Sequence, residues 1–220
     1  MVLLAACGAP KIKPRSGPTS ARPLPAAGTP AYQIDPAQSE LRLLVYRTGP
    51  LARLGHNHVI VNRALAGWVD AAEPLTSGSF SLRVPVAEFV VDDAEARGEE
   101  GADFSAAVPD DAKSGTLHNM LGTALLDVAQ YPTITLVSTG IRQQPGKLLA
   151  TITVTLKDRE SVIGVPFKLE TSADRLAASG MAVLRQSELG LTPFSVMLGA
   201  LQVQDEITVK FRLVAVKGHS

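Results

Sequence analysis

The sequence predicts an all-β protein: an antiparallel barrel of about eight strands with one inserted helix, preceded by a disordered N-terminal linker. Apolar and polar residues alternate in several short runs, as they do in strands that bury one face. Helical spacing of apolar residues is convincing in one segment only. An open sheet of this size would expose long strand edges, whereas a closed barrel has none. Closure or a second sheet is therefore expected, and the strand-rich pattern with a single long insertion favours a barrel over a two-sheet sandwich.

Length and composition set the broad class of the protein. The 220-residue chain is 45% hydrophobic, which is enough for a sizeable core in one large domain or two small ones. Its 21 basic residues balance its 21 acidic residues. A nucleic-acid-binding protein should show a strong basic excess, so nucleic acid is not an expected partner. No apolar run approaches the roughly 20 residues of a transmembrane helix.

The N-terminal residues predict export and lipidation. Cys7 is the only cysteine, and Leu4-Ala5-Ala6-Cys7 resembles the lipobox of bacterial lipoproteins, in which small residues precede the acylated cysteine. We therefore predict that residues 1–7 are a truncated signal peptide and that Cys7 is the lipidation site. Residues 8–31 are rich in Pro, Ala, Gly, Ser and Thr and predict a semi-extended linker. Because Gly8, and not Asp, follows the cysteine, we expect a lipid-anchored periplasmic protein at the outer membrane of a bacterial envelope.

The folded domain is expected at residues 32–217. Its first strand has alternating apolar residues at Leu41, Leu43 and Val45, and a second run from Val59 ends at the only tryptophan, Trp68. Further strands are expected at 80–91, 133–141, 148–156, 163–169, 181–185 and 207–215. The apolar positions change parity near 85–87, which predicts a bend in the first of these. Residues 92–111 are the least apolar stretch and contain eight acidic residues, which predicts a solvated loop in preference to a cation site.

One segment has the spacing of an amphipathic helix. Its apolar residues are Leu117, Met120, Leu121, Ala124, Leu125 and Val128. This spacing predicts a helix at around 115–129, with Ser114 or Asp111 as the N-cap. We expect this helix to act as a lid or plug on the sheet.

The usual catalytic motifs are missing from the sequence. It contains no G-x-S-x-G nucleophile elbow, no H-E-x-x-H zinc motif, no Walker-type loop and no G-x-G-x-x-G turn. We therefore do not expect an enzyme.

Several segments, taken in order, resemble YceI-like proteins. They are Tyr32-Gln-Ile-Asp-Pro-Ala-Gln-Ser39, Tyr131-Pro132-Thr133-Ile134, Val154-Thr155-Leu156-Lys157-Asp158 and Pro193-Phe194-Ser195. The Gly55-His56-Asn57-His58 segment resembles a subgroup with a Gly-His-x-His sequence there. The resemblance covers about residues 32–216. It implies a lipocalin-like, eight-stranded antiparallel barrel with a helix, which holds a long isoprenoid or another lipid.

The resemblance and the strand pattern together predict an envelope lipid-binding protein. Its ligand is expected to be an isoprenoid lipid or a quinone, no cofactor is expected, and the membrane is a partner through Cys7. A barrel filled by its own side chains, in a structural or stress-response module, is the alternative. The residues expected to face the ligand are Leu43, Val45, Trp68, Leu82, Val84, Ile152, Val154, Phe167, Val209 and Phe211.

Two of the four histidines lie two residues apart in an expected strand. His56 and His58 therefore point to the same face, close enough to share a metal ion. Neutral imidazole is a good zinc ligand, but two ligands are too few for a tight site. His118 or a carboxylate would have to supply a third. We favour a structural, hydrogen-bonding role for the pair over contact with a ligand head group, and both over metal binding.

Overall fold

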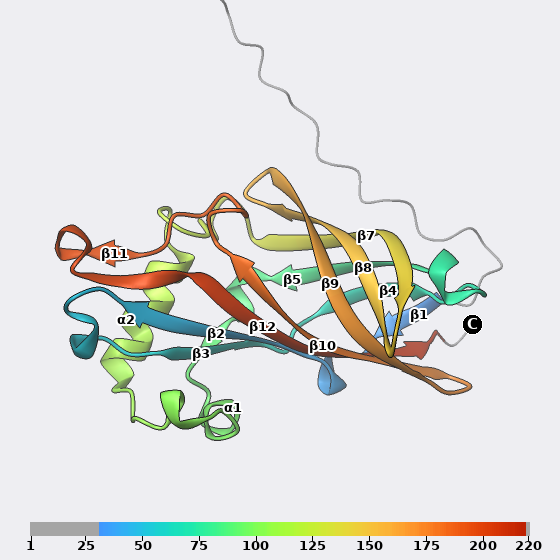
Figure 1. Ribbon diagram of the computed structural model, residues 1–220, viewed down its shortest axis with the longest axis horizontal. Coiled ribbons are helices and arrows are strands. Elements are labelled where there is room, and N and C mark those ends of the chain that lie inside the picture. Colours follow the sequence, from blue (N-terminus) through green and yellow to red (C-terminus); the bar gives the residue numbers. More distant parts are fainter. Residues whose placement is uncertain (1–30, 219–220) are drawn as a thin grey trace, which may run out of the picture.

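The computed structural model describes residues 31–218 (Figure 1). Residues 1–7 of the predicted signal segment, Cys7 among them, and residues 8–30 of the predicted linker lie outside the described residues. The described part of the chain confirms the all-β prediction, because its strands form one antiparallel sheet that closes into a barrel. Neither of its two α-helices is long and apolar enough to span a membrane.

Eight strands form the closed barrel, and each pairs antiparallel with its neighbours. In spatial order they are β1 (Ala31–Ile34), β4 (Ala66–Asp70), β5 (Ser79–Pro85), β7 (Thr133–Gln144), β8 (Lys147–Leu156), β9 (Arg159–Thr171), β10 (Arg175–Arg185) and β12 (Leu201–Lys217). The barrel closes where β12 returns to β1, with Ala215 opposite Ile34. The eight-stranded barrel expected from the alternation is therefore present.

The sheet continues beyond the barrel at one end because β12 is 17 residues long. Its C-terminal end pairs with β1, and its earlier part pairs with β2 (Glu40–Thr48). The extension then runs through β3 (His58–Asn62) to the short β6 (Val90–Val91), while β11 (Ser195–Val196) pairs with the start of β12. The helix α2 (Asp110–Leu121) lies beside this extension, and α1 (Ala94–Gly98) lies below it in Figure 1.

Alternation decides which face of each strand is buried. In β8, every second residue from Leu148 to Leu156 is buried, and the threonines between them are more exposed. The expected bend after β5 is also present, because the strand ends at Pro85 and a 3-10 turn follows at Val86–Glu88. Inward-facing aliphatic and aromatic side chains therefore surround the barrel axis.

The predicted helix has different bounds. It begins at Asp110, with Pro109 as the N-cap residue, and it ends at Leu121 instead of near residue 129. Beyond Gly122 the chain turns back, and the N–H of Leu126 donates to the carbonyl of Met120. The predicted C-terminal bound was wrong because the apolar residues after Leu121 are buried by this turn and not by a helical face.

The solvated loop predicted at residues 92–111 was also wrong. This segment contains α1, a 3-10 turn at Ala102–Phe104 and the start of α2. Ala96 and Phe104 are buried against Leu44 and Val59 in a second small core. The many acidic residues favoured a loop in the prediction, but Ala96 and Phe104 are enough to pack the segment onto β2 and β3.

Candidate ligand cavities and the histidine cluster

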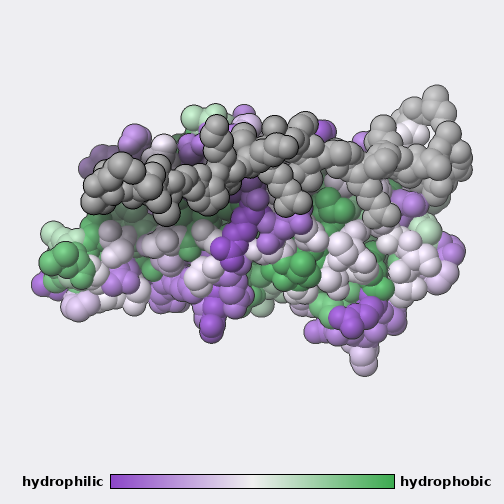
Figure 2. Space-filling view, turned by 90° about the horizontal axis from the view of Figure 1, so that it is seen from above, coloured by the Kyte–Doolittle hydropathy of each residue, from purple (hydrophilic) through white to green (hydrophobic). Residues whose placement is uncertain are grey.

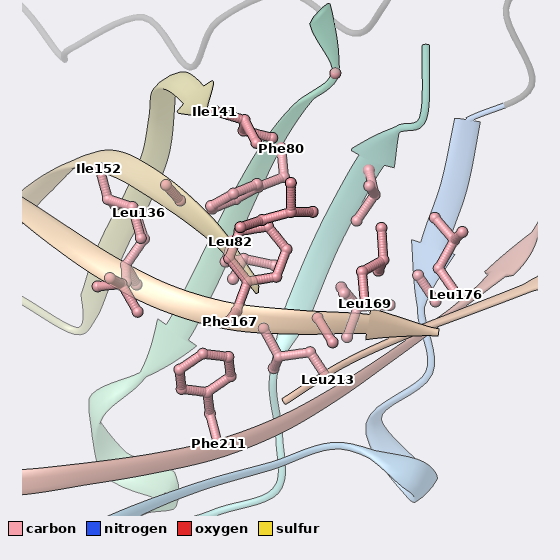
Figure 3. A pocket seen from close by; sticks show the side chains of 18 of the residues that line it. Phe80, Leu82, Leu136, Ile141, Ile152, Phe167, Leu169, Leu176, Phe211 and Leu213 are labelled. Carbon is pink, nitrogen blue, oxygen red and sulfur yellow. The ribbon is translucent and has the colours of Figure 1, made fainter. Parts of the chain in front are cut away.

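A cavity of about 170 Å³, which we call the barrel cavity, lies inside the barrel. Its walls come from β1, β2, β4, β5, β7, β8, β9, β10 and β12. Figure 3 shows Phe80, Leu82, Phe167 and Phe211 gathered around one part of it, with Leu176 farther along it. Among its lining residues only Asp70 and Ser79 have polar side chains. The lumen is thus apolar and not completely filled by side chains.

A second cavity of about 280 Å³, the end cavity, lies under α2. The inward face of β12 connects the two, because Val209 and Phe211 line the barrel cavity and Val203 and Ile207 line the end cavity. The end cavity has more polar groups on its wall. They are Arg47, His56, His58, Thr116, Asn119, Gln186 and Gln202. The two cavities together therefore offer an apolar space followed by a more polar one.

The structure places most of the predicted ligand residues on these walls. Leu82, Val84, Ile152, Phe167, Val209 and Phe211 line the barrel cavity, and Leu43 and Val45 line the end cavity. Val154 is buried against Ile134 and Leu136, beyond the last lining residue of β8. Trp68 is buried but lines neither cavity, since Val69 takes the inward position next to it.

Other lining residues were missed by the sequence analysis. They include Ile34, Leu41, Phe80, Leu136, Leu148, Ala150, Ile163, Val165, Leu169, Leu176, Ala178 and Leu213. Most of them continue an alternation that was already recognised, such as Leu41 before Leu43 and Leu213 after Phe211. The alternation could have found them, but it does not show where along a strand the cavity ends.

His58 belongs to a buried polar cluster that the sequence did not reveal. Its Nδ1 lies 2.7 Å from Oδ2 of Asp92, whose side chain has no exposed surface. The other carboxylate oxygen of Asp92 accepts from the backbone N–H of Val59 at 2.9 Å and from Arg97 at 2.6 Å. Nε2 of His58 lies 3.2 Å from the hydroxyl of Thr116 on α2. The cluster therefore connects β3, the end of β6, α1 and α2.

The charges of this cluster compensate one another. Burial by itself would raise the pKa of Asp92, but the hydrogen bond from His58, the N–H of Val59 and the charge of Arg97 outweigh burial and lower the pKa. The Arg97 guanidinium also donates to the carbonyls of Asn57 and Ala106. A buried carboxylate with several partners is expected to be expensive to disrupt. The cluster holds the wall of the end cavity in place.

The other predicted metal residues lie apart from this cluster. The rings of His56 and His58 are 6.2 Å apart, and both residues line the end cavity. His118 is exposed in the last turn of α2 and lines neither cavity. Within residues 31–218 no group of three or more His, Cys, Asp or Glu residues is arranged to hold a metal ion. Both nitrogens of His58 already have protein partners, which supports the structural role for that residue.

Solved structures share the fold of this chain. Burkholderia cenocepacia BcnA is 18% identical with a TM-score of 0.62, and the match covers 83% of this chain and 99% of that protein. The Campylobacter jejuni YCEI protein is 11% identical with a TM-score of 0.50, over 70% of this chain and 82% of that protein. No curated protein matches the sequence.

At these identities the structural matches describe the fold alone. The sequence carries independent information, because the model of the YceI-like domain matches residues 32–215. That span contains both cavities and all of the polar cluster around His58. The chain therefore belongs to the YceI-like domain family.

Proposed function

We propose that this protein binds an apolar, isoprenoid-type lipid in the barrel and sequesters or carries it without covalent chemistry. The observation that supports the proposal is the barrel cavity, whose walls are almost entirely aliphatic and aromatic. Transfer of apolar ligand surface from water into such a space is favourable by roughly 25 cal/mol per Å². An empty apolar cavity stays dry and accepts small apolar molecules.

The serial arrangement of the cavities favours an elongated ligand with a polar end. An isoprenoid tail fits the barrel cavity, where it meets few polar groups. Its polar end, such as a quinone ring, fits the end cavity, where the amide of Asn119 can hydrogen-bond to it. His56 is available for the same contact, whereas His58 is engaged by Asp92 and Thr116.

The proposed location is the periplasmic face of a bacterial envelope membrane. This part of the proposal is supported by the Leu-Ala-Ala-Cys sequence, with Cys7 as the acylated residue. A multiply acylated cysteine would anchor the domain firmly, since stable anchoring requires more than one chain. The linker predicted between Cys7 and the barrel would keep the barrel near the lipid surface that holds its ligand.

Titration with a fluorescent apolar polyene tests the binding function. We expect saturable binding at about one polyene per chain, because the barrel encloses a single apolar cavity among the described residues, and displacement by an isoprenoid alcohol. The measurement is the fluorescence of the polyene in detergent-free buffer. A protein that takes up no polyene, even after extraction with organic solvent and refolding, would instead have the filled barrel of a structural module.

A further inference from the structure

Five exposed apolar side chains gather at the end of the molecule that carries the end cavity. We call this group the apolar tip; it consists of Leu54, Phe194, Val196, Met197 and Leu198. They come from two turns that touch, since the N–H of Leu51 donates to the carbonyl of Ala200 at 2.8 Å. Figure 2 shows hydrophobic residues at the left-hand end, where β11 lies in Figure 1.

The turn that carries Met197 and Leu198 holds these side chains away from the protein. β11 pairs with the start of β12, and Met197 and Leu198 connect the two strands with positive φ angles of 52° and 55°. Bulky residues rarely adopt this conformation, and it costs free energy. Leu198 is fully exposed and Met197 is 65% exposed. The strained turn therefore exposes two apolar side chains, Met197 and Leu198, to solvent.

The charges around the tip suit a lipid surface. No charged residue occurs between Glu188 and Asp205, and the only charged residue between Arg47 and the β3 strand is Arg53. A positively charged side chain next to projecting apolar ones matches an anionic bilayer surface. A stable protein partner is a poorer fit, because such interfaces use roughly 20–30 residues a side and the tip offers five.

The tip is also continuous with the end cavity. Phe194 and Leu201 line that cavity, and they flank the segment that carries Met197 and Leu198. Arg47 near the end of β2 and His56 in the segment before β3 also line it. A lipid that leaves a bilayer at the tip would therefore reach the cavity along an apolar wall, without crossing bulk water.

We propose that the apolar tip docks onto an anionic lipid bilayer, with Met197 and Leu198 inserted among the lipids and the end cavity facing the membrane. Docking serves ligand transfer, and in this respect the inference rests on the proposed lipid-binding function. It differs from the predicted anchor at Cys7, because the tip sets the orientation of the barrel and not only its distance from the membrane.

Vesicle sedimentation tests the docking surface. The probe is a vesicle of equal parts phosphatidylcholine and phosphatidylglycerol, and the protein is the full chain with Cys7→Ser, so that no acyl chain contributes. We expect Met197→Asn/Leu198→Asn to weaken vesicle binding at least tenfold, because Asn keeps the positive φ angles and removes the apolar side chains. The matched control is Val162→Thr/Met181→Thr on the strands β9 and β10, where the side chains are 68% and 56% exposed. The control should bind vesicles like the parent.

The outcomes separate docking from ligand binding. Polyene binding is measured for each variant without vesicles, and we expect the tip variant to retain it. A parent chain that does not sediment with vesicles would refute docking, and so would equal losses in the tip variant and the control. If the parent chain is a dimer and the tip variant is a monomer, the apolar tip binds a second copy of the chain and not a bilayer, which would also contradict the proposal. If the parent chain does not bind the polyene, the proposed lipid-binding function is refuted instead.

Discussion

Ala178→Phe is expected to weaken binding of an apolar ligand by roughly 70-fold. Ala178 lines the barrel cavity from β10, next to Leu176 on the same face. A phenyl ring there takes space from a cavity of about 170 Å³. If the ring removes about 100 Å² of ligand surface from contact with the wall, the loss is about 2.5 kcal/mol, or roughly 70-fold in affinity. Fluorescence titration with the polyene measures it.

Ser179→Phe is the matched control for this variant. Ser179 is the next residue of the same strand, and it is exposed on the outer face of the barrel. The added ring is the same, but it should leave polyene affinity within a factor of two or so of the wild type. Equal losses in both variants would point to strand distortion. Unchanged affinity in Ala178→Phe would place the ligand outside the barrel cavity.

Asp92→Asn is expected to destabilise the fold by about 3 kcal/mol. The replacement keeps the size of the side chain and tolerates the φ angle of 54° at this position. It removes the charge that pairs with both His58 and Arg97, and the Arg97 side chain is only 11% exposed. Urea unfolding at neutral pH measures the difference. A change below about 1 kcal/mol would show that the cluster contributes little to stability.

Asp93→Asn serves as the neighbouring control. The side chain of Asp93 caps α1 through the N–H of Ala96 and is 28% exposed. Its replacement should cost no more than about 1 kcal/mol, since Asn is also a good N-cap. A larger loss in this control than in Asp92→Asn would contradict the importance assigned to the buried carboxylate.

The pH dependence of stability should separate Asp92→Asn from the wild type. The pKa of Asp92 is lower in the folded protein than in the unfolded chain, where it is about 3.9. Between these two values the unfolded state binds more protons, so stability falls as the pH drops. The wild-type advantage is fully present above about pH 5 and decreases below about pH 4. The unfolding free energies of the two proteins should therefore converge in acid.

The barrel could be predicted because its information is local. In β8 and β12 alternating apolar residues are a direct consequence of one buried face, and they can be read without knowing the partner strand. The same alternation placed Phe167, Val209 and Phe211 on the cavity wall. Alternation also predicted the buried position of Val154, but not that this residue lies beyond the cavity, because the end of a cavity depends on side chains from other strands.

The polar cluster could not be predicted because its information is long-range. Asp92 and His58 are 34 residues apart, and Thr116 is 58 residues from His58. The acidic residues around Asp92 suggested a solvated loop, yet one of them is buried between an imidazole and a guanidinium. An acidic residue in a sequence usually indicates exposure to solvent, but a buried carboxylate with charged partners is part of the packed interior. The burial of Asp92 follows from the packing of α1 and α2 against β3, which the sequence does not show.

Mass spectrometry of the organic extract from protein purified without detergent tests the central claim most directly. Wild-type protein should release about one apolar lipid per chain. The Ala178→Phe protein should release much less, because the introduced phenyl ring takes up space in the barrel cavity. Ser179→Phe should release as much as the wild type. An extract without stoichiometric lipid, from wild-type protein that also fails to take up the polyene, would contradict the account.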